Sequence, residues 1–316
     1  MATMLSSLMY ISSAIADPLP SWNKGKTKRQ LLHFIDSTTK TSSPDYVSVD
    51  KRIAVIDNDG TLWAEKPIYP QAAFLLDFIQ SSQNREMIEA RYCDDKVIMA
   101  LVDDDLSVLQ GLNKTQLFET LTKPVSTMSV KNYQQAANDY LHSVDNSKYQ
   151  RPHSEMLYQP LVELMRYLEA KEFTIYIVTG GGEDFVRSIS QQFYQIPPQR
   201  VIGSKTKNSN EAGVEIKGYK IDGNLNENEN KVQNIANTIG EIPLISIGNS
   251  DGDLQMLQST QNNHGLSILI SHTDGKREFS YSKASSLVEK IQPNENWMIV
   301  DMKKDFKQVF VQHQSM

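Results

Sequence analysis

Asp57 and Asp59 are the two residues of this sequence best suited to chemistry. They stand two positions apart, directly after the apolar run of residues 53–56, and Gly60 follows them. Two carboxylates at the end of a buried segment are costly unless a cation or a proton compensates them. One of them could attack phosphorus and bind Mg²⁺, while the other protonates the leaving oxygen and then activates water. The same residue types also close strands in ordinary Asx-rich turns, so this motif alone leaves both interpretations open.

A second polar turn follows the apolar run of residues 173–178. Thr179, Gly180 and Gly181 come directly after this run and before a helical pattern. A hydroxyl group and backbone N–H groups at a strand–helix junction are suited to hold phosphate oxygens. A flexible glycine turn without a ligand is the competing interpretation.

A third turn follows the apolar run of residues 243–247. It contains Asn249 and Asp253, which could complete a cation site opposite Asp57. Lys231 opens the helical pattern that leads to this run. A lysine at such a position is usually a surface residue, but beside phosphate and carboxylates it would neutralise their charge.

These turns can meet only if the apolar runs belong to one sheet. Short apolar runs alternate with helical patterns along the chain, which predicts an α/β fold with a Rossmann-like parallel sheet flanked by helices. Residues 70–148 show helical patterns and no convincing strand, so we expect an inserted α-helical cap there. The α/β core is then predicted at residues 17–69 and 149–316. Ligands of such sheets bind at the carboxyl ends of the strands, where the cap would cover the site and contact the substrate.

The four segments, in this order, resemble the four motifs of the haloacid dehalogenase superfamily. They are residues 57–62 (DNDGTL), residues 179–182 (TGGG), Lys231 and residues 248–257 (GNSDGDLQML). The likeness is closest to the phosphoserine-phosphatase-like branch, which has a helical cap inserted between the first and second motifs. It extends over nearly the whole chain. The resemblance implies a phosphatase that hydrolyses a small phosphomonoester through an aspartyl-phosphate intermediate.

The resemblance also implies a role for each matching residue. Asp57 would be the nucleophile and Asp59 the general acid and base. The residues that would hold the phosphate are Thr179, Gly180, Gly181 and Lys231, the last of which would also steady the nucleophile. The residues that would bind the Mg²⁺ cofactor are Asp57, Asp59 (through its backbone carbonyl), Asn249 and Asp253.

One position departs from the family. Where the fourth motif usually has its first Asp, this chain has Asn249, which can bind Mg²⁺ through its amide oxygen but brings no negative charge. Asp251 could turn inward and supply that charge, although Asn249 keeps the family's spacing to the second acidic residue of the motif. The lysine of the third motif is also open, because Lys205 and Lys207 follow a predicted strand and could compete with Lys231.

Two other functions compete with a phosphatase. Residues 248–252 also match the G-x-S-x-G nucleophile elbow of α/β-hydrolases, which would make Ser250 the nucleophile of an esterase with a downstream Asp and His. Such an enzyme would leave Asp57 and Asp59 without a role. A non-catalytic protein that binds a phosphorylated ligand is the third candidate, and the departure at Asn249 lends it some support.

Composition excludes several classes of partner. The 316 residues are 39% hydrophobic and 22% charged, which is typical of a soluble globular protein. The net charge of −6 and the absence of a long basic stripe argue against a nucleic-acid partner. The single cysteine, Cys93, excludes an intrachain disulfide framework and a cysteine-rich zinc site.

The N-terminal residues resemble an export signal. Residues 4–16 are apolar and rich in small residues, and they end in Ala-Ile-Ala. We therefore expect residues 1–16 to be a signal peptide and the mature protein to be periplasmic or secreted, without a membrane anchor because the run is too short to span a bilayer. No Lys or Arg precedes Lys24, so a cytoplasmic protein is the alternative.

Overall fold

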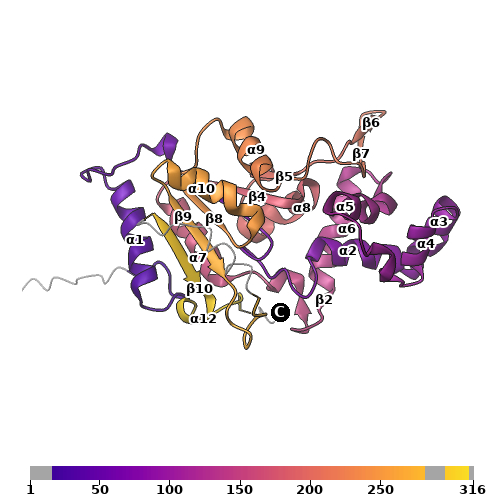
Figure 1. Ribbon diagram of the computed structural model, residues 1–316, viewed down its shortest axis with the longest axis horizontal. Helices are drawn as coiled ribbons and strands as arrows, with labels where there is room; N and C mark the ends of the chain where they lie inside the picture. Colours follow the sequence, from indigo (N-terminus) through magenta and orange to yellow (C-terminus); the bar gives the residue numbers. More distant parts are fainter. Residues whose placement is uncertain (1–15, 282–295, 313–316) are drawn as a thin grey trace, which may run out of the picture.

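The computed structural model describes residues 16–281 and 296–312. A six-stranded sheet in the order β10-β9-β8-β1-β4-β5 forms its centre (Figure 1), and every pair of neighbouring strands is parallel. The strands are β1 (Ile53–Ile56), β4 (Thr174–Gly182), β5 (Val201–Ser204), β8 (Ile245–Gly248), β9 (Leu266–Ser271) and β10 (Trp297–Asp301). The predicted Rossmann-like parallel α/β sheet is confirmed.

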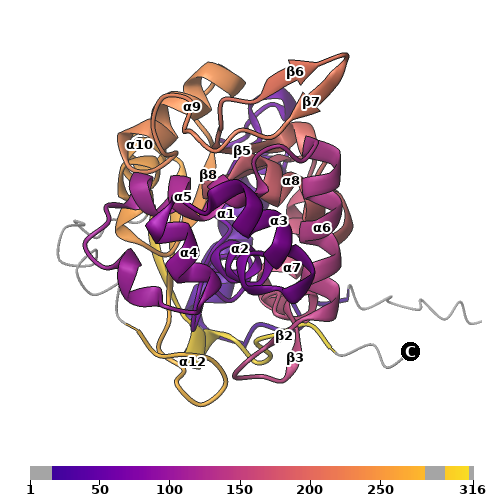
Figure 2. The same ribbon diagram turned by 90° about the vertical axis from the view of Figure 1, so that its right-hand side faces the viewer.

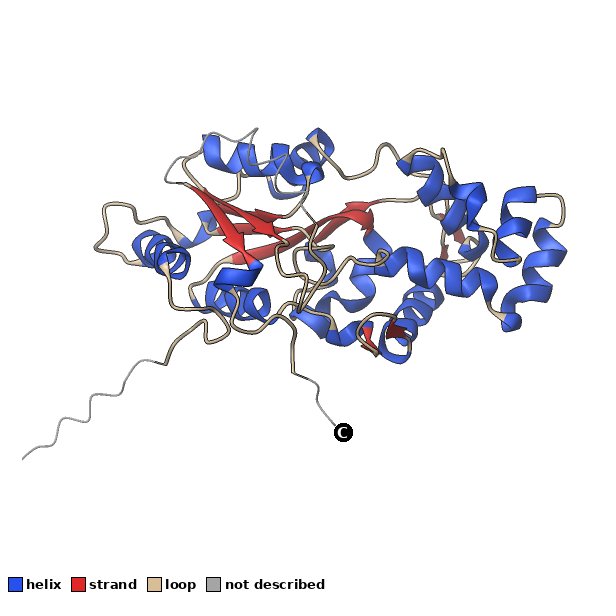
Figure 3. Cartoon of the chain, turned by 60° about the horizontal axis from the view of Figure 1, so that its bottom comes forward, coloured by secondary structure: helices blue, strands red, loops and turns tan. Residues whose placement is uncertain are grey.

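Helices cover both faces of the sheet, as Figure 3 shows. Val55 of β1 packs in a cluster with residues of α9 (Glu229–Ile239) and α10 (Leu254–Asn262). Its neighbours Ala54 and Ile56 point the other way, into the main core. The helices that contribute to this main core include α1 (Lys26–Thr39), α7 (Gln159–Ala170) and α8 (Glu183–Tyr194). Burial on both faces explains why β1 is a continuous apolar run rather than an alternating one.

A group of helices lies between β1 and β4 in the chain. They are α2 (Pro70–Gln80), α3 (Ser82–Tyr92), α4 (Lys96–Val102), α5 (Lys114–Thr122) and α6 (Val130–Ser143). Figure 1 shows them together at one end of the molecule, and in Figure 2 this end faces the viewer. They fall within residues 70–148, where the cap is predicted. The exact bounds of the cap as a domain stay a prediction.

Two short hairpins accompany the cap. One is formed by β2 (Asp145–Asn146) and β3 (Arg151–Pro152), the other by β6 (Ser209–Glu211) and β7 (Val214–Ile216). The second hairpin projects beside the cap helices in Figure 2, and the backbones of Met128 and Lys217 are joined by a hydrogen bond of 2.9 Å. The cap is thus held to the core by backbone contacts as well as by packing.

The remaining elements are short. They are α12 (Met302–Asp305) and the 3-10 turns Val49–Lys51, Leu106–Leu109, Lys123–Val125, His153–Glu155, Pro198–Arg200 and Asp251–Asp253. Within the described ranges no helix is both long and apolar enough to cross a bilayer. Residues 1–15 of the expected signal peptide lie outside these ranges, so export stays a prediction.

Candidate active site

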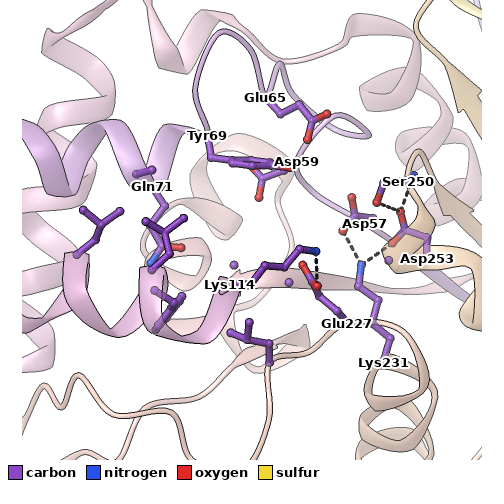
Figure 4. Close-up of a pocket in the computed structure, with 18 of the residues that line it drawn as sticks. Asp57, Asp59, Glu65, Tyr69, Gln71, Lys114, Glu227, Lys231, Ser250 and Asp253 are labelled. Carbon is purple, nitrogen blue, oxygen red and sulfur yellow. Dashed lines mark hydrogen bonds and ion pairs between the residues drawn. The ribbon is translucent and has the colours of Figure 1, made fainter. Parts of the chain in front are cut away.

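Lys231 is the centre of the site. Its Nζ donates to Asp57 Oδ1 at 2.6 Å, to Asp253 Oδ1 at 2.6 Å and to the carbonyl oxygen of Val178 at 2.9 Å (Figure 4). β1 lies between β8 and β4 in the sheet, so the turns that follow these three strands meet at one edge. One buried ammonium group therefore joins segments that are far apart in the sequence.

Two carboxylates share this one ammonium group. Lys231 is 2% exposed, and Asp57 and Asp253 are buried with it. Burial and the Asp253 carboxylate raise the pKa of Asp57 well above its ordinary value, although Lys231 acts in the opposite direction. Burial alone would lower the pKa of Lys231, but Asp253 and Asp57 outweigh it and raise that pKa. Lys231 can compensate only one of the two buried carboxylates, so the other needs a proton or a second cation.

The turn after β1 is tightly constrained. Gly60 has a φ of +76°, and its N–H donates to the carbonyl of Trp63 at 2.9 Å. The indole Nε1 of Trp63 donates to Asp59 Oδ1 at 2.8 Å. Thr61 Oγ1 lies 3.4 Å from Asp57 Oδ2. The turn thus fixes both carboxylates, and it needs a glycine because φ is positive and a Cβ at this position would lie only 2.0 Å from Asn249 Nδ2.

The turn after β8 is held by Asp253. Its Oδ2 accepts from the backbone N–H of Asn249 at 3.1 Å and from the N–H and hydroxyl of Ser250 at 3.0 and 3.1 Å. Its Oδ1 is on Lys231. Because both oxygens are engaged, Asp253 acts here as the partner of Lys231 and as the support of the turn. Its predicted role as a direct Mg²⁺ ligand stays a prediction.

The segment that contains Thr179 differs from the expected open turn. β4 continues through Gly182 instead of ending at Val178, with a shift of register against β5. Thr179 is fully buried, and its Oγ1 accepts from the N–H of Gly181 at 3.0 Å. Gly180 and Gly181 line the cavity described below, whereas Thr179 does not. Thr179 therefore shapes the turn, and its predicted contact with phosphate stays a prediction.

A cavity of about 200 Å³ opens above Asp57. Its polar lining includes Asp57, Asp59, Glu65, Gln71, Lys114, Glu227, Lys231 and Ser250 (Figure 4). Its apolar lining is Ala72, Leu75, Leu117, Phe118, Leu121 and Leu225. All but the last of these apolar residues come from α2 and α5. The cavity thus has a charged wall from the core and an apolar wall from the cap.

Comparison with known proteins supports the fold. No family model matches the sequence, and no curated protein does. A conserved functionally unknown protein from Anaerococcus prevotii DSM 20548 has 14% identity and a TM-score of 0.59, over 89% of this chain and 93% of that one. A protein of unknown function from Bordetella pertussis Tohama I has 15% identity and a TM-score of 0.52, over 80% of this chain and 99% of that one. A HAD family hydrolase from Salmonella enterica serovar Typhi also matches (15% identity, 81% of this chain, 69% of that one), with a TM-score of 0.44.

The arrangement of the motifs decides which fold this is. The first, second and fourth motifs lie at the carboxyl ends of neighbouring parallel strands. Lys231, the third motif, bridges Asp57 of the first and Asp253 of the fourth. A group of helices is inserted between the first and second motifs. The chain has a Rossmann-like parallel α/β fold that is consistent with the haloacid dehalogenase core its motifs imply.

Within this fold the open alternatives of the sequence have different outcomes. Lys231 contacts Asp57, and neither Lys205 nor Lys207 lines the cavity. Neither Asp251 nor Asn249 lines the cavity; Asp251 is exposed, whereas Asn249 is buried beside the turn after β1. Lys231 is the lysine in contact with Asp57, and the choice of Asn249 as a metal ligand stays a prediction.

The environment of Ser250 does not support a nucleophile elbow. Its hydroxyl donates to Asp253 rather than to a histidine. His272, one of the downstream histidines that such an elbow could use, has Nε2 2.7 Å from the carbonyl oxygen of Gly60 and Nδ1 3.1 Å from Glu278. With both ring nitrogens engaged, His272 is not available as the base. His313 lies outside the described residues.

Three residues at this site were not singled out from the sequence. Glu65 and Gln71 line the cavity, and Gln71 accepts from the N–H of Gly182 at 2.8 Å. Asn226 is fully buried, and its Nδ2 donates to the carbonyl oxygens of Thr179 and Ile202, which ties the ends of β4 and β5 together. Only Glu65 had a signal, since it follows the first motif by a few residues.

Within the described residues, no group of three or more His, Cys, Asp or Glu side chains is arranged to hold a metal ion. The haloacid dehalogenase arrangement implied by the sequence does not require such a cluster, because it uses a backbone carbonyl and, here, an amide oxygen. Asn249 Oδ1 is buried and has no hydrogen-bond partner among the described residues, which fits an oxygen that faces a cation.

Proposed function

We propose that this protein is a Mg²⁺-dependent phosphatase that hydrolyses a small phosphomonoester through an aspartyl-phosphate on Asp57. The observation that supports this most is the buried Lys231 ammonium, 2.6 Å from Asp57 Oδ1 at the floor of the cavity. It holds the carboxylate in place and provides positive charge where phosphate oxygens would lie.

Asp57 and Asp59 would supply the nucleophile and the proton transfers of both halves of the reaction. In the first, a carboxylate oxygen of Asp57 bonds to phosphorus, the bond from phosphorus to the leaving oxygen breaks, and Asp59 gives its proton to that oxygen. In the second, water attacks phosphorus, Asp59 takes the proton of the water, and phosphate leaves Asp57. Trp63 fixes Asp59 by the indole hydrogen bond of 2.8 Å, so the same carboxyl group can serve in both steps.

Mg²⁺ fits the residues around Asp57. Two buried carboxylates share one lysine, so a second cation is needed to compensate both of them. Asn249 Oδ1 also accepts no hydrogen bond from the described residues. Asp57 and Asn249 would hold the ion, with the backbone carbonyl of Asp59. The ion would supply positive charge that stabilises the phosphoryl group during transfer.

The cap wall points to the kind of leaving group. Phe118, Leu117 and Leu75 face the cavity from α5 and α2, opposite the carboxylates. The Lys114–Glu227 ion pair, 2.5 Å long, joins the cap to the core beside this wall. We infer that the phosphate enters toward Lys231 and that the rest of the substrate presents an apolar surface to the cap.

Hydrolysis of an aryl phosphate by the Asp57→Asn variant tests the function. An amide cannot form the phosphorylated intermediate, so turnover should fall by about three orders of magnitude or more. Asp251→Asn is the matched control, because Asp251 is exposed and outside the cavity, and it should keep near-normal turnover. Retention of a tenth of normal activity in a pure, folded Asp57→Asn protein would refute the mechanism.

A further inference from the structure

The side chain of Asn249 is buried but only partly satisfied. It is 1% exposed, and among the described residues its Oδ1 has no hydrogen-bond partner. A Cβ placed on Gly60 would lie only 2.0 Å from Asn249 Nδ2, so the amide packs directly on the turn that carries Asp57 and Asp59. An unmet buried acceptor costs about 1–3 kcal/mol, which is unexpected unless a ligand meets it.

Glu65 determines the orientation of the Asn249 amide, that is, the directions in which Oδ1 and Nδ2 point. Its Oε1 lies 3.5 Å from Asn249 Nδ2. An ionised carboxylate only accepts hydrogen bonds, so it favours the orientation that turns the amide nitrogen toward itself and Oδ1 away. The contact is long, and its effect on orientation comes from charge as much as from hydrogen bonding.

Glu65 itself is held at the cavity. It is 2% exposed and lines the cavity with Asp57 and Asp59. The N–H of the preceding residue, Ala64, donates to the carbonyl of Met156 at 3.1 Å, which anchors the loop. Figure 4 shows Glu65 and Asp59 on the same loop. A buried carboxylate in this place is a fixed source of negative charge next to the neutral Asn249.

We propose that Glu65 is the positioning residue of the Mg²⁺ site and supplies the negative charge that Asn249 lacks. Asn249 Oδ1 would contact the ion, while Glu65 interacts with Nδ2 at the other end of the same amide. The inference rests on the proposed function, because it concerns the cation of that site. It differs from the family pattern, in which the ligand itself carries the charge. Here the charge would be on a second residue, Glu65, which is on the loop after β1 and not on the turn after β8.

The proposal makes the two positions interdependent. A carboxylate at position 249 would face the Glu65 carboxylate at about the present 3.5 Å, and two buried like charges at that distance repel strongly. A single carboxylate, at position 65 or at position 249, should therefore be enough for tight binding of the ion. Carboxylates at both positions together should not bind it more tightly. Outer-shell partners of metal ligands typically change metal affinity by about 10–100-fold when they are replaced.

The test is a titration of the full-length protein with Mn²⁺, followed by electron paramagnetic resonance, with Mg²⁺ as the competitor and no substrate. Glu65→Gln should raise the Kd for Mn²⁺ about 10–100-fold. The double variant Glu65→Gln, Asn249→Asp should restore the Kd to within about threefold of the unmodified protein. Glu227→Gln is the matched control, since it removes a carboxylate from the same cavity that faces Lys114 instead, and it should change the Kd by less than about threefold.

Several outcomes would overturn the proposal: an unchanged Kd in Glu65→Gln, a double variant no better than Glu65→Gln, or an unmodified protein that binds no Mn²⁺. If Glu65→Gln alone does not fold, the single variant Asn249→Asp is compared with the double variant. The double variant, which lacks the Glu65 charge, must then have the lower Kd for Mn²⁺. An unmodified protein that binds no Mn²⁺ would also contradict the Mg²⁺ dependence of the proposed function, whereas the other two outcomes leave it intact. The phosphatase itself is tested separately by the Asp57→Asn assay.

Discussion

Lys231 is the residue on which both the stability and the chemistry of the site depend. Its replacement by Met would leave the buried carboxylates of Asp57 and Asp253 without their cation. Loss of one partner of a buried ion pair typically costs about 3–5 kcal/mol, so urea unfolding of Lys231→Met should show a loss of that size, with activity lost as well. Lys114→Met is the control: that side chain is 71% exposed, and its ion pair should contribute about 1 kcal/mol or less. A loss below about 1 kcal/mol in Lys231→Met would contradict the view that Lys231 holds the cluster together.

Asp59 offers a more selective change. Asp59→Asn can still accept the indole hydrogen bond of Trp63 through its amide oxygen, so the fold should be preserved. It cannot take up or give a proton, and general acid–base help is typically worth about 10²–10⁴-fold. We expect kcat for an aryl phosphate to fall by that factor while the free energy of unfolding changes little. A kcat within a factor of about three of the unmodified enzyme would remove Asp59 from the mechanism.

At the scale of elements, the buried strands were the most predictable part. β1 and β8 are buried along their whole length and β4 contributes apolar side chains to both clusters, so the three read as largely apolar runs bounded by polar turns. β10 was not predicted from the sequence. It lies at the edge of the sheet, and the 39% exposed Ile299 interrupts the buried pattern by which the central strands were found. α3 also gave little signal, since among its residues only Ile88 and Tyr92 are buried.

The same contrast holds for the site. Asp57, Asp59, Lys231 and Asp253 could be singled out because their types and places after apolar runs indicate chemistry. Glu65 could not, because its position depends on how the loop after β1 folds back against Asn249. The extension of β4 through residues 179–182 was also beyond the sequence, since three glycines predict a turn unless tertiary contacts such as those of Gln71 hold them extended.

α5 is the element that should set substrate preference. Phe118 faces the cavity from this helix, and an apolar contact of its size is worth about 1–3 kcal/mol. In Phe118→Ala, kcat/KM for phenyl phosphate should fall about 10-fold, while kcat/KM for ethyl phosphate falls less than about threefold because ethyl phosphate does not reach that wall. Leu109→Ala, in the same cap but outside the cavity lining, should leave the ratio of the two substrates unchanged. Equal losses on both substrates in Phe118→Ala would indicate that the cap wall does not read the leaving group.

At the scale of the whole molecule, function requires that the cap and the core keep their relative position, since the cavity has one wall from each. Two joints act besides the Met128–Lys217 hydrogen bond and other cap–core contacts. The Lys114–Glu227 ion pair lies at the cavity, and the segment after α6 returns the chain to the core through β2 and β3. His153 lies at this second joint, where its ring stacks on Tyr140 of α6 with centroids 5.7 Å apart.

His153 should make this joint sensitive to acid. It is 4% exposed, its Nδ1 has no hydrogen-bond partner among the described residues, and burial lowers its pKa to about 4, against a small opposing effect of Asp145. The unfolded chain binds the proton near pH 6.5 and the folded chain only near pH 4, so the stability contributed by neutral His153 is present above pH 6.5 and is lost as the pH falls toward 4. Between pH 7.5 and pH 5 this single group should remove about 2 kcal/mol of unfolding free energy. His153→Phe keeps an aromatic ring against Tyr140 and cannot titrate, so urea unfolding at the two pH values should show a smaller loss in the variant by about that amount. If both proteins lose the same free energy, the proton is bound equally in the folded and unfolded states, and the joint between α6 and the core is not where acid acts.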